Sequence, residues 1–113
     1  MTGIHHVAIT VHDLAQALDF YTRTLGFEQR TDRPSDLGPG VWLDVGDQQV
    51  HLVAGAPPAA QGQHFAVLVE DLDATVERLR ADGVFVSDPA PIGAARQSFL
   101  SDPSGNSIEL HQA

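Results

Sequence analysis

The sequence predicts an α+β fold built from two similar modules, each made of one strand, one helix and three further strands. The first observation is a segment at residues 6–14 that returns at residues 64–72, 58 positions later. The second is that both copies change from a period of two to a helical period after an aspartate. The third is that the last predicted strands of the two halves hold His51 and Glu109, again 58 positions apart. One structural unit is therefore expected to be used twice.

The repeated segment begins as a strand and continues as a helix. Apolar residues alternate along each copy and form its core face: Val7, Ile9 and Val11 in the first, and Phe65, Val67 and Val69 in the second. His6 and His64 begin the opposite face of their strands. Asp13 and Asp71 end the strands, and we expect each to cap the following helix because a carboxylate accepts hydrogen bonds from the first free N–H groups.

The remaining elements of the first module follow from periodicity and turn residues. Apolar residues recur at steps of three and four between residues 14 and 25, which predicts an amphipathic helix that ends at Gly26. The next elements are predicted in this order: a strand at 27–31, a loop at 32–40, and strands at 41–45 and 48–53.

The second module repeats this order after a connector at 54–63 that contains Pro57-Pro58. The predicted elements are a strand from 64, a helix at 72–81 with Leu72, Val76 and Leu79 inward and a stop at Gly83, a strand at 84–87, a loop at 88–95, a strand at 96–100, a turn at 102–106 and a strand at 107–110. These boundaries predict one domain over residues 1–113, with modules at about 4–53 and 64–112.

Composition limits the function classes. Fifteen acidic residues against six basic ones give a formal charge of −9, which argues against nucleic acid or anionic membranes as partners. The absence of cysteine excludes disulfides, thiolate ligands and a cysteine nucleophile. The chain has neither an export signal at its start nor an apolar run of about 20 residues, so the cytoplasm is the expected location.

Four side chains form the candidate site: His6, His51, His64 and Glu109. They occupy equivalent positions in the repeat, on the strand faces opposite the core, and they converge if the two modules pair about a pseudo-twofold axis. Neutral imidazoles and a carboxylate suit Fe(II), Mn(II), Ni(II), Co(II) or Zn(II), whereas Mg²⁺ and Ca²⁺ prefer more oxygen ligands. The pattern therefore indicates a site for a divalent metal.

Four segments of the chain match a known pattern: HVAITVHDL at 6–14, Phe20-Tyr21 with Leu25-Gly26-Phe27, HFAV at 64–67 and DPSGNSIEL at 102–110. On these segments the chain resembles the vicinal oxygen chelate superfamily, which includes glyoxalase I, extradiol dioxygenases, methylmalonyl-CoA epimerase and bleomycin-binding resistance proteins. The resemblance covers nearly the whole chain. It implies two βαβββ modules whose sheets form a cup around a divalent metal.

The resemblance also implies roles for individual residues. His6, His64 and Glu109 match the three positions that relatives use as metal ligands, and His51 matches a fourth position that is Glu or Gln in glyoxalase-like members. His51 is then either a ligand or a base, and Glu109 either ligates alone or also transfers protons. A ligating His51 counts against Fe(II) dioxygenase chemistry, which needs three ligands and room for dioxygen.

The implied function is that of a glyoxalase-like metalloenzyme, an isomerase, lyase or ring-cleaving oxygenase, acting on a small substrate with vicinal oxygen atoms. Two other readings remain: a protein that sequesters a drug or metabolite without turnover, and a member that holds metal for structure only. Trp42 and Phe99 lie opposite the core and are expected to line the substrate site or to cover the second sheet face. His111 follows Glu109 on the same face. A homodimer that shares its modules between chains is the expected assembly.

Overall fold

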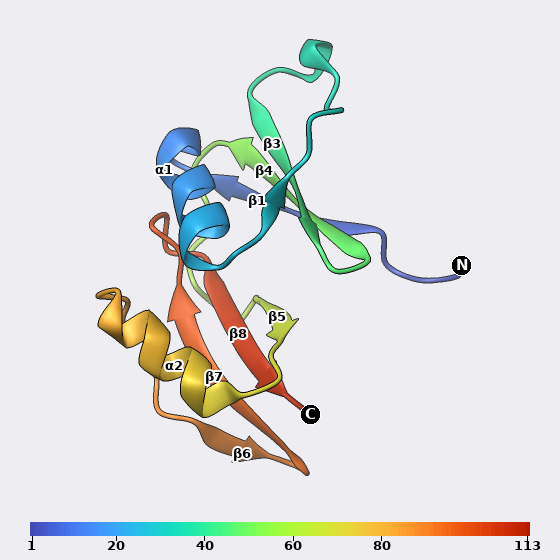
Figure 1. Ribbon diagram of the computed structural model, residues 1–113. Helices are drawn as coiled ribbons and strands as arrows, with labels where there is room; N and C mark the ends of the chain where they lie inside the picture. Colours follow the sequence, from blue (N-terminus) through green and yellow to red (C-terminus); the bar gives the residue numbers. More distant parts are fainter. The chain divides into compact units, whose positions relative to one another are not determined.

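The computed structural model describes residues 1–113, which form two compact units, Met1–Ala59 and Ala60–Ala113. Each unit contains one four-stranded sheet and one main helix (Figure 1). The elements of the first unit are β1 (His6–Val11), α1 (Leu14–Asp19), the π-helical turn η1 (Phe20–Thr24), β2 (Glu28–Gln29), the 3₁₀ turn η2 (Ser35–Leu37), β3 (Gly40–Val45) and β4 (Gln48–Ala54). Those of the second unit are β5 (Phe65–Leu68), α2 (Leu72–Ala81), β6 (Ala90–Ile92), β7 (Ala95–Ser101) and β8 (Ser107–Gln112).

The two sheets have the same topology. The strand order is β1-β4-β3-β2 in the first unit and β5-β8-β7-β6 in the second. In each unit the first and last strands pair in parallel, and the other pairs are antiparallel. A parallel pair needs a crossover connection, and the helix of each unit supplies it. The predicted α+β fold of two βαβββ modules is confirmed.

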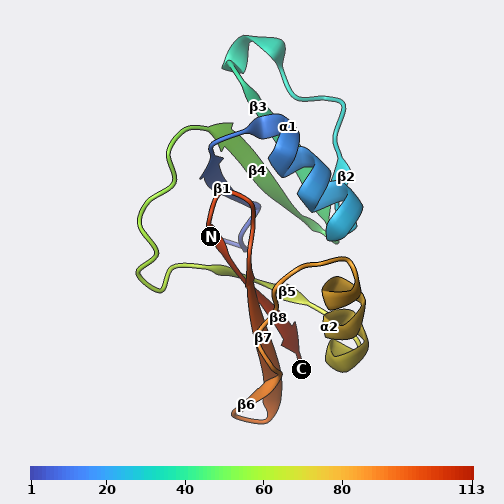
Figure 2. The ribbon, with the colours of Figure 1, turned by 90° about the vertical axis from the view of Figure 1, so that its left-hand side faces the viewer.

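The helix of each unit covers one face of its own sheet (Figure 2). The buried apolar side chains of the two cores include Val11, Ala17, Tyr21, Leu43 and Leu52 in the first unit and Leu72, Val76, Leu79, Ile108 and Leu110 in the second. The opposite sheet faces are left for polar and aromatic side chains. None of the helices combines the length and the apolar character needed to cross a membrane.

Both predicted helix caps are confirmed. The Asp13 carboxylate accepts a hydrogen bond from the Gln16 backbone N–H at 3.0 Å, and the Asp71 carboxylate accepts one from the Ala74 N–H at 3.0 Å. Helix α2 has the predicted bounds and the predicted buried residues. The turn that holds each strand to its helix is thus built in the same way in both units.

The first helix departs from the prediction of one regular helix over residues 14–25. The α-helix ends at Asp19, and a π turn follows before Gly26, whose φ of 80° ends the segment. The Thr22 hydroxyl donates to the Leu18 carbonyl at 2.7 Å. This bond takes up the carbonyl that a regular helix pairs with a backbone N–H, and such back-bonding distorts helices.

The predicted strand at 84–87 is wrong, and β6 lies instead within the predicted loop at 88–95. The Ser87 hydroxyl accepts from the Phe99 N–H at 2.8 Å, so a side chain replaces part of a strand ladder there. Pro89 and Pro91 flank Ala90 at the sheet edge, where a missing N–H is tolerated. The predicted strand at 27–31 is also shorter, with only Glu28–Gln29 in β2.

The turn at 102–106 is confirmed and is organised by one carboxylate. Asp102 is 4% exposed, and its side chain accepts from the backbone N–H groups of Ser104 and Asn106 and from the Asn106 amide, each at 2.9 Å. Hydrogen bonds to a charged acceptor are stronger than neutral ones. Asp102 therefore fixes the start of β8, the strand that carries Glu109.

We expect Asp102→Ala to lower the free energy of unfolding by about 2–3 kcal/mol, because it leaves several donors without their acceptor. Asp102→Asn keeps an amide oxygen as acceptor and is expected to cost less. Urea unfolding followed by circular dichroism measures both losses. Equal stabilities for Asp102→Ala and the unchanged chain would contradict the role given to this carboxylate.

Candidate functional site

The candidate residues lie on the sheet faces opposite the helices, in corresponding rows of the two sheets. In the first unit Ala8 of β1, His51 of β4 and Trp42 of β3 are register partners. In the second unit the same row holds Ala66, Glu109 and Phe99. Trp42 and Phe99 are therefore equivalent residues of the two modules, as are His51 and Glu109.

The first unit holds a stack of three aromatic rings. The imidazoles of His6 and His51 lie 3.9 Å apart between centroids and 14° from parallel. The Trp42 ring lies 4.7 Å from the other side of His51 at an interplanar angle of 15°. His51 is thus covered on both faces, and the residue is 9% exposed.

Hydrogen bonds fix the edges of these two imidazoles. The Gln49 amide oxygen lies 2.8 Å from Nε2 of His51, and an amide oxygen only accepts, so Nε2 carries the proton. Nδ1 of His51 is then the nitrogen with a free lone pair. Nδ1 of His6 pairs with Nδ1 of His5 at 2.9 Å, which leaves Nε2 of His6 without a hydrogen bond.

Burial lowers the pKa of His51, and the neighbouring His6, His5, Arg33 and Arg30 lower it further. Desolvation disfavours the charged imidazolium, and nearby cationic or ionisable groups act in the same direction. His51 is therefore held as a neutral imidazole.

The stacking limits how the first pair can bind a metal. A ligating imidazole places the ion in its own ring plane, along the nitrogen lone pair. The planes of His6 and His51 are nearly parallel, with centroids 3.9 Å apart. One ion cannot lie in both planes, so in this conformation only one of the two rings is available to a given metal.

The second unit joins His64 and Glu109 directly. Nε2 of His64 lies 3.1 Å from Oε1 of Glu109, and Nδ1 of His64 lies 2.8 Å from the Gly62 carbonyl oxygen. Nδ1 of His111 lies 2.7 Å from Oε2 of Glu109. Glu109 is buried, at 8% exposed, and each oxygen of its carboxylate lies beside an imidazole nitrogen.

The hydrogen-bond roles at His64 point to a cation. The Gly62 carbonyl only accepts, so Nδ1 of His64 carries a proton and Nε2 of the neutral ring has a lone pair. That lone pair faces an oxygen of Glu109, which also only accepts. A proton or a metal ion on Nε2 removes the conflict. A ligating histidine usually donates its other N–H to a carbonyl, as His64 does.

The spacing of the second pair also fits a metal. Ligand atoms about 2.1 Å from an ion and at right angles to one another are about 3 Å apart. The measured separation of the His64 nitrogen and the Glu109 oxygen is 3.1 Å. This separation is compatible with both atoms binding one divalent cation, and it is equally that of a hydrogen-bonded imidazolium–carboxylate pair.

The structure thus brings the predicted residues together as two pairs, His6 with His51 and His64 with Glu109. It contains no group of three or more histidine or acidic side chains arranged to hold a metal. Phe99 contacts His64 edge to face at 5.2 Å, so both predicted aromatic residues lie beside a candidate imidazole. Gln49 was missed, although its position two residues before His51 places it on the same strand face.

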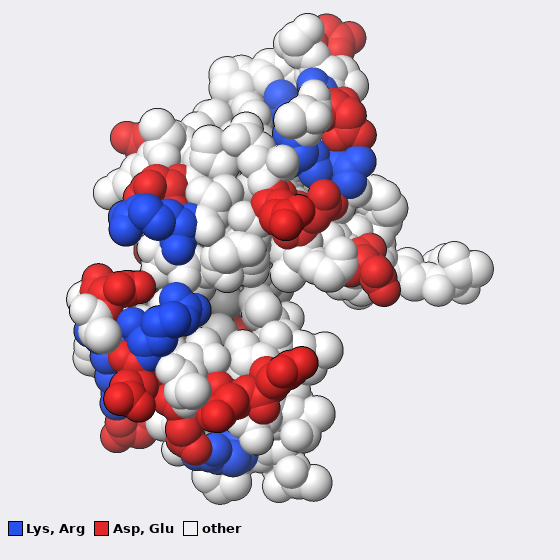
Figure 3. Space-filling model, in the orientation of Figure 1, with Lys and Arg blue, Asp and Glu red and all other residues white.

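Arginine charges are largely neutralised by carboxylates. Five of the six arginines form ion pairs: Arg23 with Asp19, Arg30 with Asp32 and Asp44, Arg78 with Asp82, Arg80 with Asp88, and Arg96 with Asp73. On the face drawn in Figure 3, blue and red atoms lie side by side over both helices.

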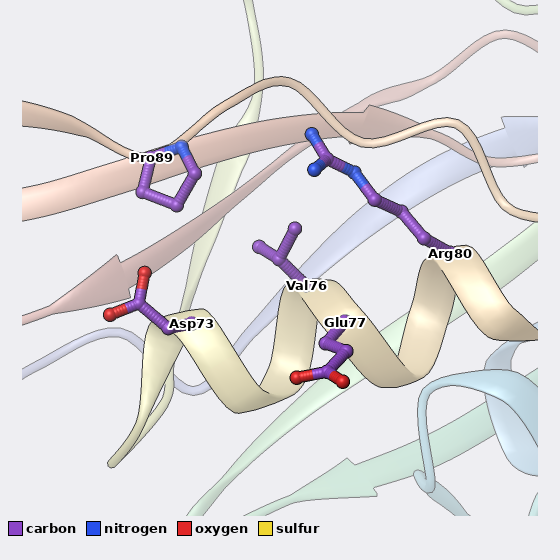
Figure 4. Close-up of a pocket in the computed structure, with 5 residues that line it drawn as sticks. All are labelled: Asp73, Val76, Glu77, Arg80 and Pro89. Atoms are coloured by element: carbon purple, nitrogen blue, oxygen red, sulfur yellow. The ribbon is translucent and has the colours of Figure 1, made fainter.

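One surface depression lies away from the candidate residues, between α2 and the segment that precedes β6. It has a volume of about 230 Å³ and is lined by Asp73, Val76, Glu77, Arg80 and Pro89 (Figure 4). Arg80 donates to the Val86 carbonyl at 2.7 Å, and Asp73 pairs with Arg96. The polar groups of this depression are thus largely committed to other partners.

Comparison with known proteins identifies a family and several relatives at about 30% identity. A family model described as Glyoxalase/Bleomycin resistance protein/Dioxygenase superfamily matches residues 3–110. A 2-epi-5-epi-valiolone epimerase of Actinomyces sp. is 32% identical over 96% of this chain and 78% of the epimerase. A lactoylglutathione lyase of Arabidopsis thaliana is 30% identical over 95% of this chain, and a catechol-2,3-dioxygenase of Bacillus subtilis is 29% identical over 98%. The chain spans only 43% of that lyase and 44% of that dioxygenase.

Solved structures with the same fold include two from Streptomyces sp. An antibiotic-binding protein has a TM-score of 0.83 and is 31% identical, with 99% of this chain and 96% of that protein covered. A glyoxalase/bleomycin resistance protein has a TM-score of 0.79 and is 32% identical, with coverages of 97% and 100%. Relatives of similar identity thus include both enzymes and a binding protein.

We expect His51 of the metal-free protein to titrate below the ordinary histidine pKa of about 6.5. Between its folded pKa and about pH 6.5, the unfolded chain binds this proton and the folded chain does not, so folding stability rises with pH. Below the pKa of His51 in the folded chain, the ring is charged in both states, and the full cost of charging the buried ring lowers the folding stability. Imidazole nitrogen shifts from ¹H–¹⁵N NMR measure the titration.

The matched variant is Trp42→Ala, which uncovers one face of the His51 ring and is expected to move its pKa back toward the ordinary value. A His51 pKa at or above about 6.5 in the unchanged chain would contradict the burial argument.

Proposed function

This chain belongs to the Glyoxalase/Bleomycin resistance protein/Dioxygenase superfamily, and on that premise we propose that it is a metal-dependent enzyme. The proposed substrate is a small molecule with vicinal oxygen atoms, and the proposed chemistry is that of an isomerase or lyase. Relatives in this range of identity include an epimerase, a lyase and a dioxygenase. Ring-cleaving oxygenase chemistry is the alternative reaction at the same site.

The proposal rests on two hydrogen-bond acceptors that face each other, Nε2 of His64 and Oε1 of Glu109. Their 3.1 Å separation and the proton on Nδ1 of His64 both support a cation held by this pair. His6 of the first unit, whose Nε2 is unbonded, is the proposed third ligand. His51, at the fourth family position, is then left as a base, because its ring stacks on His6 and one ion cannot lie in both ring planes. The first unit belongs to the same chain or to a second copy in a homodimer.

A divalent metal supplies Lewis-acid polarisation of a bound carbonyl oxygen. The chain's own residues then supply the proton transfer. His51 is the proposed base, with Nδ1 as the accepting atom, because Nε2–H already donates to Gln49. The Gln49 oxygen also stabilises the imidazolium formed when Nδ1 takes a proton. Glu109 is proposed as a ligand that shares this proton transfer.

Trp42 and Phe99 are the proposed substrate-contacting residues. They occupy the same row position in the two sheets and flank His51 and His64, respectively. Aromatic rings at these positions suit a substrate with a flat or apolar portion beside its oxygen atoms.

We expect purified protein to bind about one equivalent of divalent metal per site, and His64→Ala to retain less than about a tenth of it. Even residues that only support a ligand typically change metal affinity by about 10–100-fold, so the loss of a ligand is expected to cost more. His12→Ala is the matched control because His12 is exposed and belongs to neither pair. Elemental analysis after dialysis gives the metal content.

Equal metal content in His64→Ala and the unchanged chain, or none in either, would remove the basis for a metalloenzyme. Substrate tests then separate the two chemistries. Turnover of hemithioacetals indicates isomerase or lyase chemistry, and turnover of catechols in air but not without oxygen indicates ring cleavage. Light scattering gives the oligomeric state of the metal-loaded protein, and a stable metal-loaded monomer would reject an ion shared between two chains.

The aromatic stack of the first unit favours a second candidate function, the sequestration of a flat ligand without turnover. Three nearly parallel rings form a stacking surface, and the structurally similar antibiotic-binding protein is 31% identical to this chain. Such a function needs the ring surface but no metal.

Trp42 is the only tryptophan, so its fluorescence reports ligand stacking directly. We expect naphthalene-2,3-diol to quench it, and we expect Trp42→Ala to weaken binding by about 3- to 10-fold, since an aromatic pair contributes about 0.5–1.5 kcal/mol beyond area burial. Trp42→Phe keeps a ring and is the control, with affinities of all variants taken from calorimetry. Binding that is equally tight without metal and is followed by no turnover would favour sequestration. Unchanged affinity in Trp42→Ala would exclude Trp42 as the contact.

A further inference from the structure

Outside the four predicted ligand positions, His111 makes the shortest side-chain contact to Glu109. Its Nδ1 donates to Oε2 of Glu109 at 2.7 Å, while Oε1 of the same carboxylate faces His64 at 3.1 Å. The two residues are two positions apart on β8 and therefore share one strand face. Apart from His64, no other side chain lies within hydrogen-bond distance of this carboxylate.

This contact restricts the orientation of the carboxylate. The last torsion of a glutamate side chain has broad, roughly two-fold minima, so an unsupported carboxylate turns easily. With Oε2 bound to His111, only Oε1 is directed at His64. Glu109 is thus arranged to bind an ion through a single oxygen.

The contact is not a consequence of the repeated fold. The first unit has Val53 at the position equivalent to His111, and Val53 is 41% exposed. A valine donates no hydrogen bond. The donor therefore occurs only in the second unit, which is the unit that contains Glu109.

We propose that His111 is a positioning residue that holds Glu109 as a single-oxygen ligand for the metal. The proposal rests on the function proposed above and adds a residue to it. His111 touches neither the ion nor the substrate, and it acts through Oε2 of Glu109.

Three substitutions test this role with Co²⁺ as the probe. His111→Ala removes the donor, His111→Asn places an amide N–H near the position of Nδ1, and His111→Gln places it farther out, near the position of Nε2. Calorimetry gives the Co²⁺ affinity, and the visible absorption spectrum of bound Co²⁺ reports its coordination. Urea unfolding of the metal-free variants shows whether the fold is kept.

We expect His111→Ala to weaken Co²⁺ binding by about 10–100-fold, as is typical when a ligand loses its supporting hydrogen bond, and to alter the Co²⁺ spectrum. His111→Asn is expected to restore the affinity to within about threefold and to restore the spectrum, whereas His111→Gln restores less. Unchanged affinity and spectrum in His111→Ala would overturn the positioning role while leaving the proposed function intact. Equal losses in His111→Asn and His111→Ala would overturn it as well, and a wild-type chain without Co²⁺ affinity would overturn both.

Discussion

The structure of each unit depends on the parallel pairing of its first and last strands, β1 with β4 and β5 with β8. Parallel strands cannot be joined by a tight turn, so a helix must cross over one face of the sheet. That helix buries one face and leaves the other to polar and aromatic side chains. The same pairing places His6 of β1 beside His51 of β4. It also places His64, just before β5, beside Glu109 of β8, and these are the two candidate pairs.

The two units use one frame for different chemistry. In the first unit His51 is enclosed between two rings and bound to Gln49, so its ring is neutral and one nitrogen is already committed. In the second unit the equivalent residue is a carboxylate, and its neighbour His64 presents a lone pair to it. The first arrangement is satisfied by its own hydrogen bonds, whereas the second requires a proton or a metal ion.

Features that depend on local pattern could be predicted from the sequence. The helix at 72–81, the caps at Asp13 and Asp71 and the turn at 102–106 follow from periodicity and from the side chains that suit those positions. The strand at 84–87 could not be excluded in this way, because its alternation is correct and only the Ser87 bond to Phe99 replaces the ladder. The π turn at Phe20–Thr24 could not be predicted either, because the apolar spacing of residues 14–25 equally fits a regular helix.

For the candidate site, the sequence predicts residue types and strand faces but not hydrogen-bond partners. Gln49 and Gly62 determine which nitrogen of His51 and of His64 carries a proton, and His111 binds the second oxygen of Glu109. These contacts depend on side-chain torsions. They also bear on the choice between enzyme and binding protein. A stacking surface for a flat ligand makes no use of a largely buried carboxylate. The bond from His111 satisfies only one oxygen of Glu109, and the other oxygen still faces the His64 nitrogen. The Glu109 arrangement is therefore better explained by a cation than by stacking alone.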